Sequence, residues 1–152
     1  MPGVHRPIAL AAAITIFIAA GAAFALSGAE AVQMRRAAFD EMAQVLQFAA
    51  RNWRDPSAYA DIARAARIIE RDARSLANLF PAGTGAGDGY RTAALDAVWS
   101  DREGFDQLAS RLAEQAAGMT TVTSGTAQDQ IKEGLAGIIG TCKACHRNYR
   151  AN

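Results

Sequence analysis

Four stretches of the chain place apolar residues three or four positions apart, which is the spacing of one face of an α-helix. The first two predicted helices cover about residues 27–54 and 55–80, and the other two cover about residues 100–119 and 126–149. No stretch of the sequence alternates apolar and polar residues as a half-buried strand does. Amphipathic helices of similar length favour one all-α domain, an antiparallel four-helix bundle.

Polar residues mark the predicted helix starts. Ser27-Gly28-Ala29-Glu30 and Ser100-Asp101-Arg102-Glu103 both have the spacing of a capping box. In a capping box a serine and a glutamate each satisfy a free backbone N–H group of the first turn. Asp55 followed by Pro56 predicts the start of the second helix, and Thr126 predicts the start of the last.

A glycine-rich stretch separates the second and third predicted helices. Between Phe80 and Trp99, glycines stand at positions 83, 85, 87 and 89, and Pro81 stops the preceding helix. So many glycines cannot hold a helix against the entropy of their flexible backbone. We therefore predict a loop with one short turn at about residues 93–98, and a second loop over residues 120–125.

The chain starts with an apolar stretch, Ile8 to Leu26, which follows Arg6. A basic residue, an apolar run and then small residues are typical of an export signal. Two small-x-small cleavage sites are present, Ala23-Phe24-Ala25 and Ser27-Gly28-Ala29, and the second would leave Glu30 as the new N-terminus. The sequence does not choose between them.

An uncleaved leader is the alternative, because the apolar stretch approaches the ~18 residues that can span a membrane. We predict that residues 1–29 are a signal peptide or an N-terminal membrane anchor and that residues 30–152 are the folded domain. The positive-inside rule keeps Arg6 inside. The domain is then expected in the periplasm, with membrane contact only if the leader is uncleaved.

The charges of the chain are almost balanced, with 16 lysines and arginines against 15 aspartates and glutamates. A nucleic-acid-binding domain would carry a basic excess on one face. No nucleic-acid partner is therefore expected.

Both cysteines of the chain lie in one motif near the C-terminus, Cys142-Lys143-Ala144-Cys145-His146. On a helix, residues three and four positions apart share a face, so one turn presents both thiols and the imidazole. The spacing C-x-x-C-H is typical of c-type haem attachment. We predict one covalent haem c per chain, held by Cys142 and Cys145, with His146 as the axial ligand of its iron.

Three other uses of the motif fit less well. A thioredoxin-like dithiol needs a βαβ context, and this sequence shows no strand pattern. Structural zinc needs four protein ligands, and the only further histidine is His5, inside the leader. A disulfide between Cys142 and Cys145 on a helix would be strained.

Both cysteines fall on the apolar seam of the last predicted helix. Because this seam faces the interior of a bundle, the haem is expected to be built into the core. The seam residues are Ile131, Leu135, Ile138, Cys142, Cys145 and Tyr149.

At this point the chain resembles the cytochrome c' family, over nearly all of residues 30–152. The resemblance implies a four-helix bundle with haem c attached at the C-terminal helix, and family members are commonly homodimers. Mitochondrial-type cytochromes c carry the motif near the N-terminus instead. The likeness rests on the haem motif followed by Tyr149-Arg150, on Val98-Trp99-Ser100-Asp101 with Phe105, on the loop from Phe80 to Asp88, and on Arg35 with Phe39.

The resemblance also implies roles for residues outside the motif. Arg35 matches the arginine beside a haem propionate, and Phe39 matches the residue that covers the distal face. Arg36 either bonds the haem edge or faces water. Thr84 and Gly85 match loop contacts to the haem.

Arg150 matches a basic residue that stands beside the proximal face in the family. It also has a simpler explanation, because a positive charge at the C-terminal end of a helix interacts favourably with the helix dipole. Both explanations stay open.

Five-coordinate, high-spin iron is the expected state. His146 is the only histidine after the leader, so two histidines of one chain cannot both ligate the iron. In low-spin relatives of the family methionine stands at the position of Phe39, which cannot ligate. Met34, Met42 and Met119 are the remaining methionines of the domain, and Met42, nearly one turn beyond Phe39, keeps a low-spin Met/His alternative open.

A distal face closed by Phe39 and Met42 offers no hydrogen-bond donor to bound O₂. Nitric oxide and CO need no such donor, so they are the expected ligands. No distal His, Asp or Glu is expected to move protons, so we predict a non-enzymatic protein that binds gases. The alternative is a low-spin electron-transfer cytochrome with periplasmic redox partners, and the same haem can carry one electron in either case.

A homodimer is the expected assembly, because the first helix carries apolar residues outside its seam. The same residues could instead pack inside one bundle. They are Met34, Ala38, Val45 and Phe48.

Overall fold

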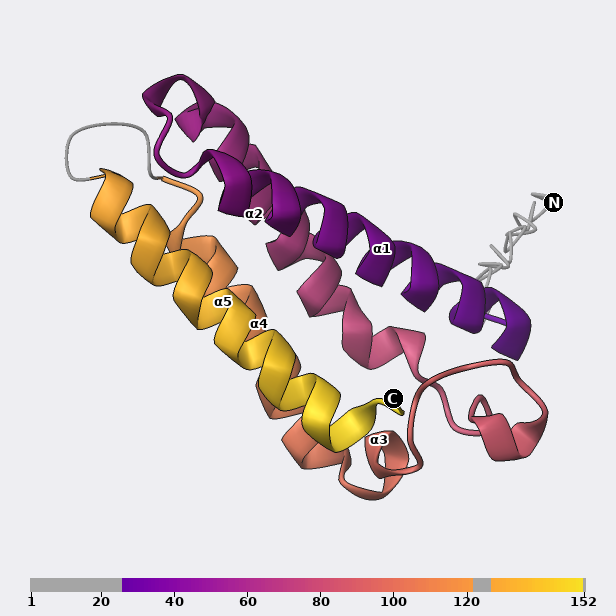
Figure 1. The fold of residues 1–152 in the computed structure, drawn as a ribbon. Coiled ribbons are helices and arrows are strands. Elements are labelled where there is room, and N and C mark those ends of the chain that lie inside the picture. The colour runs from indigo at the N-terminus through magenta and orange to yellow at the C-terminus, as the bar shows by residue number, and fades with distance from the viewer. Residues whose placement is uncertain (1–25, 122–126, 152) are drawn as a thin grey trace, which may run out of the picture.

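The computed structural model describes residues 26–121 and 127–151 of the chain. Within these residues four long helices form one bundle, in which each long helix runs antiparallel to the next one along the chain (Figure 1). They are α1 (Gly28–Asn52), α2 (Tyr59–Ser75), α4 (Arg102–Gly118) and α5 (Ala127–Tyr149). The predicted all-α four-helix bundle is confirmed.

Short helical turns connect the long helices. A 3₁₀ turn, η1 (Pro56–Ala58), follows Asp55, whose carboxylate accepts a hydrogen bond of 2.9 Å from the Ser57 N–H. The predicted loop after the second helix contains η3 (Ala86–Asp88) and ends in α3 (Ala97–Ser100). The short turn therefore lies a few residues later than predicted. Gly83 and Gly89 both have positive φ in this loop, a conformation that favours glycine.

The first capping box is confirmed. The Ser27 N–H donates to the Glu30 carboxylate at 2.9 Å, and the Glu30 N–H donates to the Ser27 hydroxyl at 3.3 Å. Helix α1 therefore begins before residue 30, the predicted start of the folded domain. Residues 1–25, with most of the predicted leader, lie outside the described residues, as does Thr126. None of the described helices is long and apolar enough to cross a membrane.

The second capping box, predicted at Ser100, is wrong by one residue. Ser100 ends α3, and Asp101 is the N-cap of α4, with its carboxylate accepting from the Gly104 N–H at 3.3 Å. The reason is the short helix itself, because the Asp101 N–H already bonds the Ala97 carbonyl.

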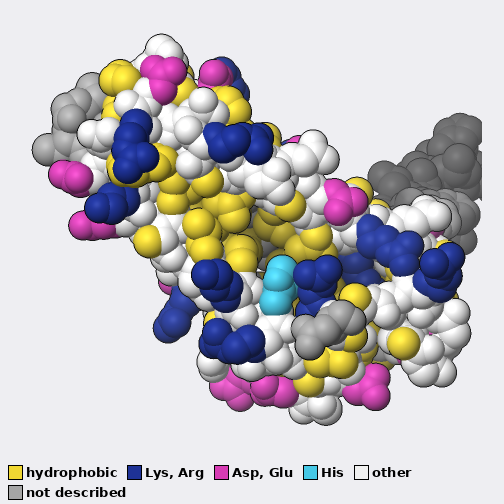
Figure 2. Space-filling model, in the orientation of Figure 1, with side chains coloured by type: hydrophobic (Ala, Val, Ile, Leu, Met, Phe, Trp, Pro, Cys, Tyr) yellow, Lys and Arg dark blue, Asp and Glu magenta, His cyan; other side chains and the backbone are white. Residues whose placement is uncertain are grey.

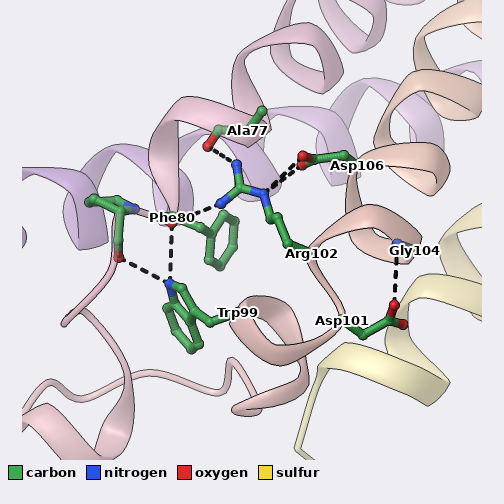
Figure 3. Close-up of polar contacts among 8 residues, drawn as sticks. Ala77, Phe80, Trp99, Asp101, Arg102, Gly104 and Asp106 are labelled. Carbon is green, nitrogen blue, oxygen red and sulfur yellow. Dashed lines mark hydrogen bonds and ion pairs between the residues drawn. The ribbon is translucent and has the colours of Figure 1, made fainter.

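The second long helix is shorter than predicted. Its α-helical part ends at Ser75, and the chain continues as a 3₁₀ helix, η2 (Leu76–Leu79). Figure 3 shows how the carbonyls at this end are used. Arg102 donates to the carbonyls of Ala77 and Phe80, and the Trp99 indole also donates to the Phe80 carbonyl. Side chains from later in the chain therefore satisfy carbonyls that a continuing α-helix would have used.

The core lies between the four long helices. Ile62, Ile131, Ile138 and Val98 are its largest fully buried side chains, and many alanines let the helices approach closely. Helix α2 packs against both α1 and α4, and α4 packs against α5, whereas α1 and α5 touch at few positions. This uneven packing leaves room between α1 and α5.

The end of α5 is tied to the loop before α3. The Leu95 N–H donates to the Tyr149 carbonyl at 2.9 Å, and the Ala151 N–H donates to the Ala93 carbonyl at 2.8 Å. Ala94 pairs with Arg150 in an isolated antiparallel bridge. We call residues 91–94 the rim segment, because they border the cavity described next.

Candidate haem site

One cavity of about 910 Å³ opens between α1 and α5, and both cysteines and the histidine of the C-x-x-C-H motif line it. Cys142 and Cys145 are half-buried on α5, while His146 is exposed. In Figure 2 this histidine, the only one among the described residues, lies beside a hollow with an apolar floor and basic side chains on both sides. The two thiols and the imidazole therefore converge on one cavity, as the motif predicts.

Apolar side chains from the other long helices form much of the cavity wall. Helix α2 contributes Ile69 and the following turn η2 contributes Leu76, whereas α4 contributes a longer stripe of apolar side chains. The cavity is comparable in size with the pockets of about 300–1,000 Å³ that hold small molecules and cofactors. The α4 stripe consists of Phe105, Leu108, Ala109 and Leu112.

Burial sets the protonation of the motif. It raises the pKa of the Cys142 thiol, and burial together with Cys142 raises the pKa of Cys145 to about 11. Both side chains are therefore neutral thiols at neutral pH. Burial and the nearby Arg150 lower the pKa of His146, which favours the neutral imidazole that can ligate iron.

Phe39 of α1 lines the cavity and packs against a second phenylalanine. Its ring lies edge-on to Phe80, with 6.3 Å between ring centroids. Phe39 is half-buried, whereas Phe80 is only 3% exposed and also meets Phe105 edge-on at 4.9 Å. The predicted distal residue therefore rests on a buried aromatic wall.

Phe80 itself is held at its backbone. Its carbonyl accepts hydrogen bonds of 3.2 Å from both the Trp99 indole and the Arg102 guanidinium (Figure 3). Arg102 is in turn fixed by the Asp106 carboxylate, with N···O distances of 2.8 and 2.9 Å. Sequence reasoning did not find this network, because Arg102 is 22 residues from Phe80 and no local pattern joins them.

Arg35 is 2% exposed and lines the cavity from α1. Its guanidinium donates to the Thr84 hydroxyl at 3.0 Å, to the Thr84 carbonyl at 2.8 Å and to the Thr92 hydroxyl at 2.9 Å. It also lies 4.6 Å from the centroid of the Phe80 ring. The buried charge thus holds two parts of the long loop as well as bordering the cavity, and its contact with a haem propionate stays a prediction.

The other predicted contacts divide into two groups. Arg36 lines the cavity and donates to the Arg91 carbonyl, and Arg150 lines it just after the end of α5. Thr84 and Gly85 are buried and are not among the residues that line the cavity. Their role as haem contacts stays a prediction. In this structure Thr84 is connected to the cavity by the hydrogen bonds that it accepts from Arg35.

The three methionines differ in position. Met42 is 7% exposed and lines the cavity, whereas Met34 is 48% exposed. Met119 is buried beside Gly134 and does not line the cavity. Met42 is therefore the methionine that lies where a thioether could approach a haem.

Asp40 was missed by sequence reasoning, which expected no carboxylate on the distal side. This exposed residue of α1 lines the cavity and follows Phe39 in the chain. An acidic residue on an amphipathic helix usually marks the solvent-facing side, so the sequence carries no signal for this position. The open space between α1 and α5 brings it to the edge of the site.

A family model described as Cytochrome C' matches residues 30–150. The chain belongs to the cytochrome c' family. It is 30% identical to cytochrome c' of Rhodopseudomonas palustris over 144 residues, which cover 92% of this chain and 94% of that protein.

Solved cytochromes c' share the fold. The crystal structure of cytochrome c' from Thermochromatium tepidum matches with a TM-score of 0.75 and 25% identity, covering 84% of this chain and 99% of that one. A nitrosyl complex of a cytochrome c' variant from Alcaligenes xylosoxidans matches with a TM-score of 0.70 and 20% identity, covering 82% and 98%. This second likeness shows the fold alone.

Haem c is the cofactor of a cytochrome c', and the residues of this cavity fit it. Two thiols and an imidazole from one helix face an apolar wall in the same cavity. Guanidinium groups are suitable partners for carboxylates such as propionates. Four of them border the cavity, from Arg35, Arg36, Arg91 and Arg150.

Proposed function

We propose that this cytochrome c' binds nitric oxide, and also CO, at a five-coordinate, high-spin haem c in the periplasm, and that it can carry one electron. The observation that carries the proposal is the position of Phe39. It stands on the cavity wall contributed by α1, across from the motif helix, and its phenyl ring has no atom that can ligate iron.

The motif residues have distinct roles in this proposal. In the holoprotein Cys142 and Cys145 would hold the group through thioethers, and the neutral His146 imidazole would bind its iron. The bound haem supplies an iron centre that takes diatomic ligands and changes oxidation state by one electron. Arg35 and Arg36 would then compensate the charge of the propionates, and Arg150 would add a positive charge close to His146.

The distal residues select the ligand. Phe39 and Phe80 present hydrocarbon, so they stabilise no charge that develops on bound O₂. Nitric oxide and CO are small and uncharged and require no donor. Nitric oxide is the ligand in the nitrosyl complex of the Alcaligenes xylosoxidans cytochrome c' variant, which shares this fold.

Electron transfer by a low-spin, Met/His-ligated haem is the second candidate. The observation in its favour is Met42, whose buried side chain lines the cavity. The exposed Arg36 and Arg150 at the cavity edge would then face redox partners in the periplasm.

A homodimer through α1 belongs to the same proposal. Met34 is exposed on α1 and supports it. Ala38 is buried in this bundle, and Val45 and Phe48 pack partly against the core, so they offer less free surface than the sequence pattern predicts. A dimer contact on α1 would therefore centre on Met34.

Optical and EPR spectra of the purified holoprotein test the proposal. We expect high-spin spectra in both oxidation states, and a ferrous form that takes up nitric oxide and CO but not O₂. A low-spin resting spectrum would support the Met42 alternative instead.

Kinetics of CO binding test the role of Phe39. Phe39→Ala should raise the CO association rate at least several-fold, because the phenyl ring no longer has to move. Phe48→Ala is the matched control, because Phe48 lies on the same helix but does not line the cavity. An equal CO association rate in wild type and Phe39→Ala would show that the Phe39 ring does not control ligand entry.

A further inference from the structure

Tyr149 lines the cavity, whereas the other two tyrosines and both tryptophans of the chain, all of them among the described residues, do not. Its side chain is 4% exposed and stands on α5 three residues after His146, the predicted axial ligand. A phenol gives up an electron more readily than a phenyl ring does, because loss of its O–H proton leaves a neutral radical. Tyr149 is therefore the aromatic side chain of the cavity wall that is easiest to oxidise.

The phenol of Tyr149 already has a proton acceptor. Its hydroxyl donates to Asp101 Oδ2 at 2.6 Å. This is the short distance of a hydrogen bond from a hydroxyl to a carboxylate, and it lies within reach for proton transfer. Asp101 is exposed, whereas the tyrosine side chain is buried. The carboxylate therefore connects a buried phenol with the solvent.

The acceptor is fixed by the start of α4. Asp101 Oδ1 accepts from the Gly104 N–H at 3.3 Å, so the carboxylate is held by the helix cap while its other oxygen faces the phenol. A methyl group at position 104 would lie 2.6 Å from both the Tyr149 hydroxyl oxygen and Asp101 Oδ2. The glycine therefore leaves the space in which phenol and carboxylate meet.

The rings next to Tyr149 are poor places for a positive charge. Tyr149 meets Phe105 edge-on at 5.4 Å, and Phe105 meets Phe80 at 4.9 Å. The Arg102 guanidinium lies 5.9 Å from the Phe105 centroid, and the Arg35 guanidinium lies 4.6 Å from that of Phe80. Like charges this close repel each other, and a phenyl ring has no acidic proton to release. An electron vacancy that reaches Tyr149 is therefore expected to stay there.

We propose that Tyr149 is a redox-active residue, which gives one electron to the haem when hydrogen peroxide oxidises it and passes its phenolic proton to Asp101. The O–H bond of Tyr149 breaks and an O–H bond forms on the Asp101 carboxylate, leaving a neutral tyrosyl radical and a carboxylic acid. Hydrogen peroxide is the oxidant, and it takes up two electrons, with two protons from the solvent, to become two water molecules. Tyr149 supplies one of these electrons and the iron supplies the other.

EPR spectra of the ferric holoprotein, frozen directly after mixing with hydrogen peroxide, test the role of Tyr149. We expect a tyrosyl radical in wild type and its loss in Tyr149→Phe, which keeps the ring that packs on Phe105. Tyr59→Phe is the matched control, because Tyr59 is 8% exposed but does not line the cavity. An equal radical yield in wild type and Tyr149→Phe, or no tyrosyl radical in wild type, would overturn the proposal.

The variant Asp101→Asn tests the proton transfer. Asparagine is as good an N-cap as aspartate, so the start of α4 is kept, but its amide does not take up a proton. We expect a radical yield several-fold below that of wild type, and slower radical formation by wild type in heavy water. A wild-type yield in Asp101→Asn, with no effect of heavy water on wild type, would overturn the assignment of Asp101 as the acceptor.

This inference rests on the proposed function, since hydrogen peroxide needs the open axial side of a five-coordinate haem. The resting spectrum, recorded before peroxide is added, tells the two apart. A high-spin resting spectrum without a radical on Tyr149 would overturn the role of Tyr149 alone. A low-spin resting spectrum with a radical on Tyr149 would contradict the proposed coordination and support the role of Tyr149.

Discussion

The Tyr149 hydroxyl at the end of α5 donates a hydrogen bond of 2.6 Å to the carboxylate of Asp101, the N-cap of α4. The ring of Tyr149 meets Phe105 edge-on, with 5.4 Å between centroids. One tyrosine therefore links the helix that carries the haem motif to the start of its neighbour, by a polar contact and by an aromatic one.

Removing the Tyr149 hydroxyl should have a pH-dependent cost. Tyr149→Phe should lower the free energy of unfolding by about 1–2 kcal/mol at neutral pH, because a hydrogen bond to a carboxylate is lost. The hydrogen bond to Asp101, helped by burial, raises the pKa of Tyr149 to about 12. The unfolded value is about 10. The contribution is therefore present below pH ~10 and is lost as the pH rises toward ~12.

Urea unfolding of wild type and Tyr149→Phe across this alkaline range measures the difference. A double-mutant cycle with Asp101→Asn separates the bond from the packing of the ring. A difference that stays constant up to pH ~12 would contradict the assignment of the raised pKa to this hydrogen bond.

Arg35 and Arg36 should respond differently to the same substitution. Arg35→Lys keeps the charge but loses the fork that reaches Thr84 and Thr92, so we expect a cost of about 1–3 kcal/mol. Arg36→Lys is the neighbouring exposed control and should cost less than about 0.5 kcal/mol. Chemical unfolding gives both values. Equal costs would show that the buried hydrogen bonds of Arg35 add no stability.

Arg102 should contribute more to the free energy of unfolding than a surface arginine does. Arg102→Ala removes donors from the Ala77 and Phe80 carbonyls, so we expect a loss of about 1–3 kcal/mol. Arg64→Ala is the control, because Arg64 pairs with Asp61 at a well-exposed position and should change stability by less than about 0.5 kcal/mol. Near-UV circular dichroism should also change in Arg102→Ala, because Trp99 shares the Phe80 carbonyl. An unchanged signal with an unchanged stability would refute this role of Arg102.

Two glycines of α5 should respond in opposite directions to alanine. Nothing lies within 4 Å of the place where a methyl group on Gly140 would stand, so Gly140→Ala should stabilise the protein by about 0.5–1 kcal/mol through helix propensity. A methyl group on Gly134 would lie 2.5 Å from both Cγ and Sδ of Met119, so Gly134→Ala should destabilise it by about 1–3 kcal/mol. Thermal unfolding of both variants measures these two changes in stability. Stabilisation by Gly134→Ala would mean that Met119 moves aside without cost.

Phe39→Met tests the coordination of the iron. Low-spin relatives carry methionine at the matching position, and Met/His is a common haem ligand pair. The variant should therefore convert the expected high-spin spectrum into a low-spin one and should slow the binding of CO. Phe48→Met is the control on the same helix, away from the cavity. A high-spin spectrum in Phe39→Met would place residue 39 out of reach of the iron.

Much of the fold follows from patterns that are local in the sequence. The helical spacing of apolar residues predicts α1, α2, α4 and α5, and the Ser27 box predicts the start of α1 within a residue. The C-x-x-C-H motif needs one helical turn and no other segment, so its side chains could be placed before the fold was known.

The remainder depends on contacts between residues far apart in the chain. Arg102, more than 20 residues later, bonds carbonyls at the end of the second helical segment, and α3 moves the next N-cap from Ser100 to Asp101. Thr84 matches a haem contact by resemblance, yet in this fold its direct partner is Arg35. Side-chain partners of this kind are set by how the helices meet, which periodicity does not encode.

The pairing of Ala94 with Arg150 makes the edge of the cavity depend on the last residues of the chain. Loss of Arg150 and Ala151 would break the bridge, the bond to the Ala93 carbonyl and the last bond of α5, from the Arg150 N–H to the His146 carbonyl, while the rest of the bundle keeps its hydrogen bonds. Trimming by a carboxypeptidase would therefore loosen the rim segment at Ala93 and Ala94, and ease access to the cavity, while the four helices stay packed.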